Sequence, residues 1–180
     1  MRRMAFLPSL WHAFAEIFRA PFLGQHLWWQ LGPVLVLWLI LEIYLDCHKG
    51  ERLGWNTALG NAISLFWISL AAMQPLFTVP VGESFPYGRF FAILPILAYA
   101  LFVGYVSFSH VFGERVTYAL AYPTIVYYLC VFAILWGNKA LDVNRYVLLA
   151  AALLFGVVYG LRWLFFWLLP DAEGAFAGSG

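Results

Sequence analysis

The sequence predicts an all-α membrane protein, a polytopic helix bundle of five transmembrane helices preceded by an amphipathic helix at the membrane interface. Hydrophobic residues make up 64% of the 180 residues and charged residues only 11%, whereas about 25% of a typical soluble domain is charged. Apolar stretches recur, each close to the ~20 residues that a bilayer core requires. Because no polar stretch between them is long enough to fold separately, we expect a single membrane domain.

Residues 1–26 are expected to form the interfacial helix. Pro8 and Pro21 bracket an amphipathic segment, and Glu16 interrupts its apolar character, which argues against a cleavable signal peptide. One helical face carries Leu10, Trp11, Phe14, Ile17 and Phe18, and another carries His12, Glu16 and Arg19. Such a helix either lies in the membrane interface or packs on neighbouring helices of the same chain.

The transmembrane domain is expected to occupy residues 27–170. We place its spans at 28–46, 57–79, 89–112, 116–136 and 146–169. Pro33, Pro75, Pro95 and Pro123 lie within four of them and predict kinks. Gly156 and Gly160 form a GxxxG pair, which predicts close helix packing within the bundle or, as the alternative, a dimer interface. Residues 171–180 are small and polar and are expected to form a flexible tail.

The distribution of Lys and Arg predicts the orientation. The N-terminal side carries Arg2, Arg3, Arg19, Arg89, Lys139 and Arg145, and the other side carries Lys49, Arg52 and Arg115. This excess favours a cytoplasmic N-terminus and an external C-terminus, in a cell (inner) membrane.

Polar residues inside the spans are concentrated in one leaflet. Each span crosses the membrane in the direction opposite to the one before it. The ends of the first, third and fifth spans therefore lie on the same side of the membrane as the starts of the second and fourth. The candidate site residues gathered there form a predicted polar pocket: Glu42, Asp46, Asn61, His110, Tyr118, Tyr122, Tyr159 and Arg162.

Glu42 and Asp46 are four residues apart, so they share one helix face about a turn from its end. Carboxylates at a helix C-terminus oppose the macrodipole, which favours a compensating cation nearby. Arg162 can extend its side chain toward the same interface, and we predict a pair between Glu42 and Arg162. Lys49 and Arg52 are the competing partners.

Two chemical roles remain open for these residues. Asp46, His48, Glu51 and His110 supply oxygen and nitrogen donors for a possible metal site, although their spacing matches no known ligand motif. Glu42 or Asp46 could instead act as acid or base on a lipid-like substrate. Familiar catalytic motifs such as HExxH are absent from the sequence, so whether the protein is an enzyme stays open.

The leading hypothesis is therefore a small non-catalytic integral membrane protein, either an accessory subunit of a membrane complex or a binder of a lipid or another hydrophobic ligand. The alternative is an integral membrane enzyme that acts on a lipid-like substrate. Expected partners are membrane lipids, with other membrane subunits or a homo-oligomer as further possibilities. A net charge of +1 without a basic tract argues against nucleic acid, and the sequence identifies no cofactor.

Overall fold

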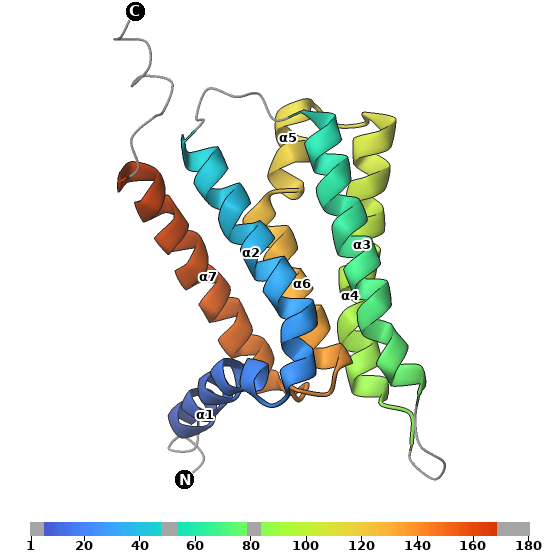
Figure 1. The fold of residues 1–180 in the computed structure, drawn as a ribbon, viewed down its shortest axis with the longest axis vertical. Helices are drawn as coiled ribbons and strands as arrows, with labels where there is room; N and C mark the ends of the chain where they lie inside the picture. Colours follow the sequence, from blue (N-terminus) through green and yellow to red (C-terminus); the bar gives the residue numbers. More distant parts are fainter. Residues whose placement is uncertain (1–5, 48–53, 79–83, 169–180) are drawn as a thin grey trace, which may run out of the picture.

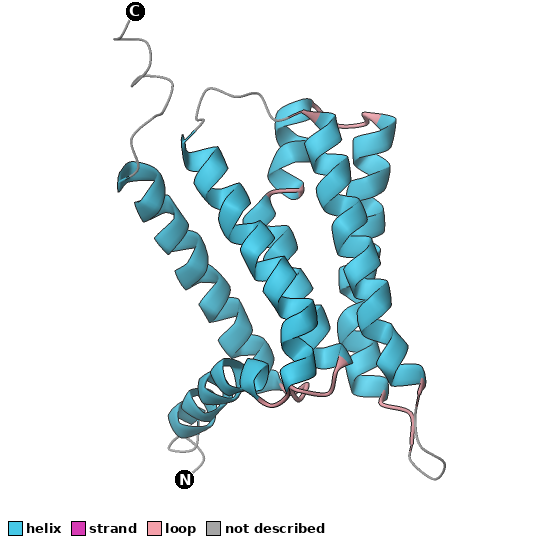
Figure 2. Cartoon of the chain, viewed as in Figure 1, coloured by secondary structure: helices cyan, strands magenta, loops and turns pink. Residues whose placement is uncertain are grey.

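The computed structural model describes residues 6–47, 54–78 and 84–168, and all regular structure within these ranges is helical (Figure 2). In chain order the elements are α1 (Phe6–Arg19), the short 3-10 helix η2 (Ala20–Phe22), α2 (Gln25–Cys47), α3 (Trp55–Phe77), α4 (Tyr87–Ser109), α5 (Glu114–Leu120), α6 (Pro123–Gly137) and α7 (Arg145–Leu168). Five spans in the described ranges are long and apolar enough to cross a membrane, and α5 and α6 together form the fourth. The predicted fold class is confirmed.

Helix α1 lies across the end of the bundle and packs on α7 (Figure 1). Its residues Ala13 and Ile17 are buried, whereas Trp11 and Phe18 are exposed. Packing on the same chain, one of the two alternatives for this segment, is therefore observed. Its placement in a membrane interface stays a prediction. We call this end of the bundle the α1 end and the opposite end the α5 end.

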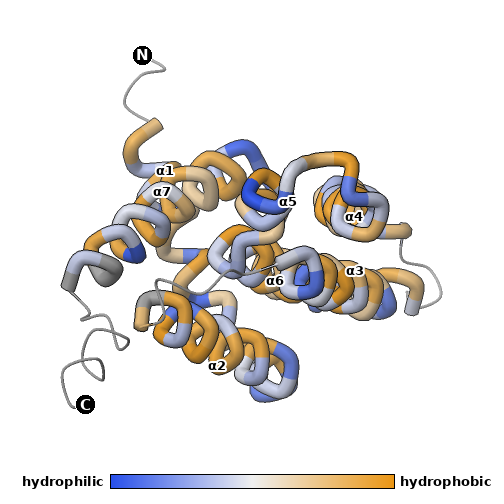
Figure 3. The backbone as a smooth tube through the Cα atoms, turned by 90° about the horizontal axis from the view of Figure 1, so that it is seen from above, coloured by the Kyte–Doolittle hydropathy of each residue, from blue (hydrophilic) through white to orange (hydrophobic). Residues whose placement is uncertain are grey.

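Helix α6 occupies the centre of the bundle. It contacts α2, α3, α4 and α7, and the span to which it belongs is the most enclosed of the five. The view along the bundle shows α6 with α4 and α7 on either side and α2 and α3 nearby (Figure 3). Gly137 permits a close approach to α3, because a Cβ atom at this position would lie 2.0 Å from the carbonyl oxygen of Ala72.

The fourth span is broken between its two helices, nearer its α5 end. Helix α5 ends at Leu120, and α6 begins at Pro123, whose ring cannot continue a helix hydrogen-bond ladder. Two carbonyl groups freed at the break accept side-chain hydrogen bonds, Leu120 from the Tyr99 hydroxyl at 2.6 Å and Ala121 from the Asn61 amide at 2.8 Å. Neighbouring helices thus satisfy backbone groups that would be costly to leave unpaired in a membrane.

The other three intramembrane prolines do not interrupt their helices. Pro33, Pro75 and Pro95 lie inside α2, α3 and α4, each of which is one continuous α-helix. Of the four prolines expected to kink a span, Pro123 is therefore the one at which the helix is interrupted and a new helix begins.

Helix α7 stands at the edge of the bundle. It packs mainly on α1, and its contacts with α2 and α6 are sparse, so it is separated from α2 along much of its length in both views (Figures 1 and 3). The prediction that Gly156 and Gly160 pack closely within the bundle is wrong. No described heavy atom lies within 4 Å of a Cβ atom built on either glycine, because both are on the outward side of this peripheral helix.

Candidate functional site

Glu42 in α2 is the centre of a polar cluster at the depth predicted from the sequence. Its Oε1 atom accepts hydrogen bonds from the Trp38 indole nitrogen at 3.0 Å and from the Thr124 hydroxyl. The Nε atom of Arg162 lies 3.4 Å from its Oε2 atom. The predicted pair between Glu42 and Arg162 is therefore present, and it joins α7 to α2 where the two helices otherwise touch little.

The break in the fourth span explains why α6 contributes to this cluster. Thr124 is the second residue of α6, directly after Pro123. The N-terminus of a helix carries a partial positive charge and unpaired N–H groups, which favour a nearby anion. In an unbroken span this terminus would lie at the membrane surface. Here it lies inside the span, and Glu42 supplies the anion.

The guanidinium group of Arg162 packs against aromatic rings. Its Cζ atom lies 4.1 Å from the centroid of the Tyr122 ring and 6.0 Å from that of Tyr159. A cation over an aromatic face is attracted by the ring quadrupole, most strongly where water is excluded. The side chain of Arg162 is 21% exposed and that of Glu42 is 16% exposed, so most of the pair is covered by protein.

Among the buried polar atoms of the cluster, three stand out because they make no hydrogen bond with any described residue and belong to three different helices. They are Glu42 Oε2, Arg162 Nε and the hydroxyl of Tyr118. The first two approach each other without hydrogen-bond geometry. Tyr118 lies in α5, its ring packs on Tyr122 with centroids 5.5 Å apart, and it is close enough to interact electrostatically with both charged groups. Because buried polar atoms are nearly always paired in native proteins, these three require an explanation.

Not all predicted pocket residues join this cluster. Asn61 is buried and donates its hydrogen bond to the Ala121 carbonyl, so it serves the helix break. His110 ends α4 in the left-handed region with φ of 53°, and its ring lies 4.2 Å from that of Trp55. Both residues have the expected depth, but their side chains contact other groups.

The described part of the structure does not show the proposed metal ligands gathered at one site. His48 and Glu51 lie outside the described ranges, and Asp46 belongs to α2 without a described side chain. His110 is exposed beside Trp55. Among the described side chains no group of three or more His, Cys, Asp and Glu residues forms a possible metal site, and the metal role stays a prediction.

Two residues of the cluster were not anticipated from the sequence, Trp38 and Thr124. Trp38 precedes Glu42 by four residues, and this spacing on a helix predicts contact. Thr124 follows a proline, which is favoured at the first position of a helix, so a hydroxyl at a helix N-terminus could have been inferred. The surrounding apolar run, however, reads as one continuous span and gives no other sign of a helix N-terminus at this position.

Comparisons with protein-family models, with curated proteins and with solved structures find no match to this chain.

Proposed function

We propose that this chain is a non-catalytic membrane protein that binds a lipid-like ligand and receives the ligand's polar group in the cluster around Glu42. The observation that carries the proposal is the gathering of three buried polar atoms without hydrogen-bond partners among the described residues, Glu42 Oε2, Arg162 Nε and Tyr118 Oη. They come from three helices, α2, α7 and α5, so a single polar group placed among them would bridge all three.

The chemistry of these atoms favours an alcohol. Glu42 Oε2 accepts a hydrogen bond and Arg162 Nε donates one, while the Tyr118 hydroxyl can do either. A ligand hydroxyl both donates and accepts, so it can satisfy the carboxylate and the guanidinium together. Ile43 and Trp163, which follow Glu42 and Arg162 in the sequence, are exposed apolar side chains that suit a hydrophobic body. We therefore expect a lipid alcohol.

The contacts of Glu42 favour binding over acid and base catalysis. A general base must reach the proton that it removes from its substrate. Trp38, Thr124 and Arg162 already surround this carboxylate, so its oxygens are engaged by groups of the protein itself. An accessory-subunit role has no separate observation in its favour among the described contacts.

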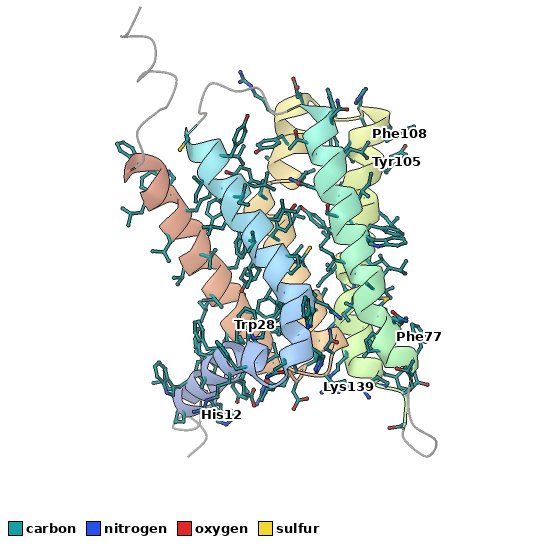
Figure 4. All side chains as sticks on the ribbon, viewed as in Figure 1. His12, Trp28, Phe77, Tyr105, Phe108 and Lys139 are labelled. Carbon is teal, nitrogen blue, oxygen red and sulfur yellow. The ribbon has the colours of Figure 1, made fainter. Side chains whose placement is uncertain are left out.

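Replacing Tyr118 by phenylalanine tests the proposal. The protein is extracted in a mild detergent, and lipids that remain bound are identified by native mass spectrometry. We expect Tyr118→Phe to lose a bound lipid alcohol that the wild type retains. Its melting temperature should change little, because the hydroxyl makes no hydrogen bond to a described residue. Tyr105→Phe is the matched control, since Tyr105 points away from the bundle (Figure 4) and is 66% exposed.

Equal retention of the same lipids by wild type and Tyr118→Phe would contradict the proposal. So would a wild-type protein that retains no alcohol while remaining folded. A second variant, Arg162→Lys, keeps the cation but removes the planar donor group, and we expect it to weaken retention while Glu42 remains paired.

A further inference from the structure

We propose that a groove between α4, α6 and α7 binds one anionic phospholipid, with an acyl chain in the groove and the phosphate group at the α1 end of the bundle. This inference concerns the leaflet opposite the Glu42 cluster and rests on separate observations. It therefore stands whether or not the cluster binds a lipid alcohol.

The groove has the size and chemistry of an acyl-chain site. Its volume is about 710 Å³, within the range of small-molecule sites. Three helices supply mainly apolar walls, including Phe91, Pro95, Leu129, Phe132, Leu148 and Ala152. The hydroxyl of Tyr128, which also lines the groove, is used internally, because it donates to the Ala151 carbonyl at 2.5 Å. The groove therefore offers little to a polar ligand body.

The groove extends over about one leaflet. Along α6 its lining runs from Ile125 to Trp136, which corresponds to roughly 16 Å of helix at about 1.5 Å per residue. Half of a hydrocarbon core of about 30 Å is about the same length. Because Ile125 lies near the break in the fourth span and Trp136 near its end, the groove reaches from the middle of the membrane to the α1 end.

Trp136 marks the interfacial end of this groove. It is 6% exposed, and its indole N–H is buried without a hydrogen-bond acceptor among the described residues. Indole side chains are typical of the depth at which lipid headgroups begin. An ester carbonyl of a phospholipid is an acceptor found at that depth, so a lipid in the groove supplies the hydrogen-bond acceptor that the described residues do not.

The charge at this end suits an anionic headgroup. Of the described residues at the α1 end, the cations are Arg19, Arg89, Lys139 and Arg145 and the anions are Glu16 and Asp142, a formal net charge of +2. At the α5 end the described side chains include Arg115 and Arg162 against Glu42 and Glu114, a formal net charge of zero. A phosphodiester is therefore attracted to the end where the groove opens.

Two cations next to the groove remain available for such a headgroup. Arg89 is committed, because it forms an ion pair with Asp142 at 2.6 Å. Arg145 instead packs over the Tyr146 ring at 4.8 Å and donates to its hydroxyl. Lys139 is exposed in the turn between α6 and α7 (Figure 4) and forms no ion pair with a described carboxylate.

The backbone at Lys139 supports a role for its charge. Its φ angle is 60°, and the N–H of Ala140 bonds to the Leu135 carbonyl. This is the Schellman arrangement, in which glycine is the favoured residue at the left-handed position. A lysine there is conformationally unfavourable, so its presence requires a compensating benefit, and binding of a phosphate group supplies one.

The test measures binding of phosphatidylglycerol and phosphatidylcholine with identical acyl chains to the delipidated full-length protein by native mass spectrometry. We expect phosphatidylglycerol to bind more tightly. Lys139→Gly should weaken phosphatidylglycerol binding about fivefold, which is the change in affinity expected for the loss of one cation near an anionic headgroup. The affinity for phosphatidylcholine should be unchanged. The same variant should be at least as thermally stable as wild type, because glycine relieves the backbone. Arg115→Gln, which removes a cation at the α5 end, is the control and should change neither affinity.

A second pair of variants tests the groove itself. Ala152→Phe places a ring in the groove from an exposed position, and we expect it to reduce binding of both lipids. Ala71→Phe, at an exposed position of α3 outside the groove, should bind both like wild type. Equal affinity for the two lipids, an unchanged affinity of Ala152→Phe, or a second protein chain that occupies the groove in the purified sample would each overturn the proposal.

Discussion

Neutralising Glu42 is the most direct perturbation of the structure. In Glu42→Gln the side chain can still accept the hydrogen bonds of Trp38 and Thr124, but Arg162 loses its counter-ion. Removing one partner of a fully buried ion pair costs roughly 3–5 kcal/mol, and a lone cation at the centre of a membrane helix costs about 2.5–3.5 kcal/mol on insertion scales. Arg162 is six residues from the end of α7, or about 9 Å of helix. Its side chain can therefore extend toward the interface.

These bounds predict a loss of about 2 kcal/mol in the free energy of unfolding for Glu42→Gln, below the fully buried value because the two side chains keep 16% and 21% exposure. The assay is reversible unfolding in mixed micelles, followed by circular dichroism. Glu16→Gln is the matched control. Glu16 is 36% exposed and pairs only with His12 among the described residues, so its replacement should change stability by less than about 0.5 kcal/mol.

A double-mutant cycle separates the pair from other effects of the substitution. If Glu42 and Arg162 stabilise each other, Glu42→Gln combined with Arg162→Gln should cost less than the sum of the single changes, with a coupling energy of about 1–2 kcal/mol. Effects that add to within about 0.5 kcal/mol would show that the two groups are neighbours without mutual stabilisation, and the predicted site would lose its central contact.

The remaining predictions concern packing and the helix break. Asn61→Ala should lower the free energy of unfolding by about 1–3 kcal/mol, because it removes the donor to a carbonyl freed at the break. Asn56→Ala, at an exposed position of the same helix, is the control and should have little effect in the same assay. Gly137→Ala should destabilise by more than about 3 kcal/mol or prevent folding, because its methyl group would meet the Ala72 carbonyl at 2.0 Å. The methyl group added in Gly156→Ala would meet no described atom within 4 Å, so this change should be neutral or stabilising by up to about 1 kcal/mol. Similar losses of stability for both glycine variants in thermal denaturation would contradict the packing described for α6.

The spans and the central ion pair could be predicted because both depend on depth along the membrane normal. Hydropathy and span length place each residue at a depth, and alternation of the helices assigns it to a leaflet. Glu42 and Arg162 are at similar depths in that scheme, and long side chains can find each other across a few ångströms. The structure confirms the spans and the contact between these two residues.

The positions of residues around the bundle axis could not be predicted in the same way. Asn61 and His110 have the predicted depth, yet Asn61 contacts the helix break and His110 contacts Trp55. Which helix neighbours which is decided by packing of apolar surfaces, and a uniformly apolar helix carries almost no sequence signal for its buried side. The outward orientation of Gly156 and Gly160 has no sequence signal for the same reason.

The break at Pro123 connects these observations. A helix interruption inside a membrane is stable only where the freed backbone groups find partners, and here Tyr99 and Asn61 bind the carbonyls at the end of α5 while Thr124 and Glu42 meet at the start of α6. The polar side chains of Tyr99, Asn61 and Thr124 therefore serve the break itself. Within the cluster around Glu42, the buried polar atoms that it leaves over include the Tyr118 hydroxyl and the facing atoms of Glu42 and Arg162. A site with so few free polar atoms suits a ligand with a single polar group, and for this reason a lipid alcohol fits the cluster better than a highly polar substrate would.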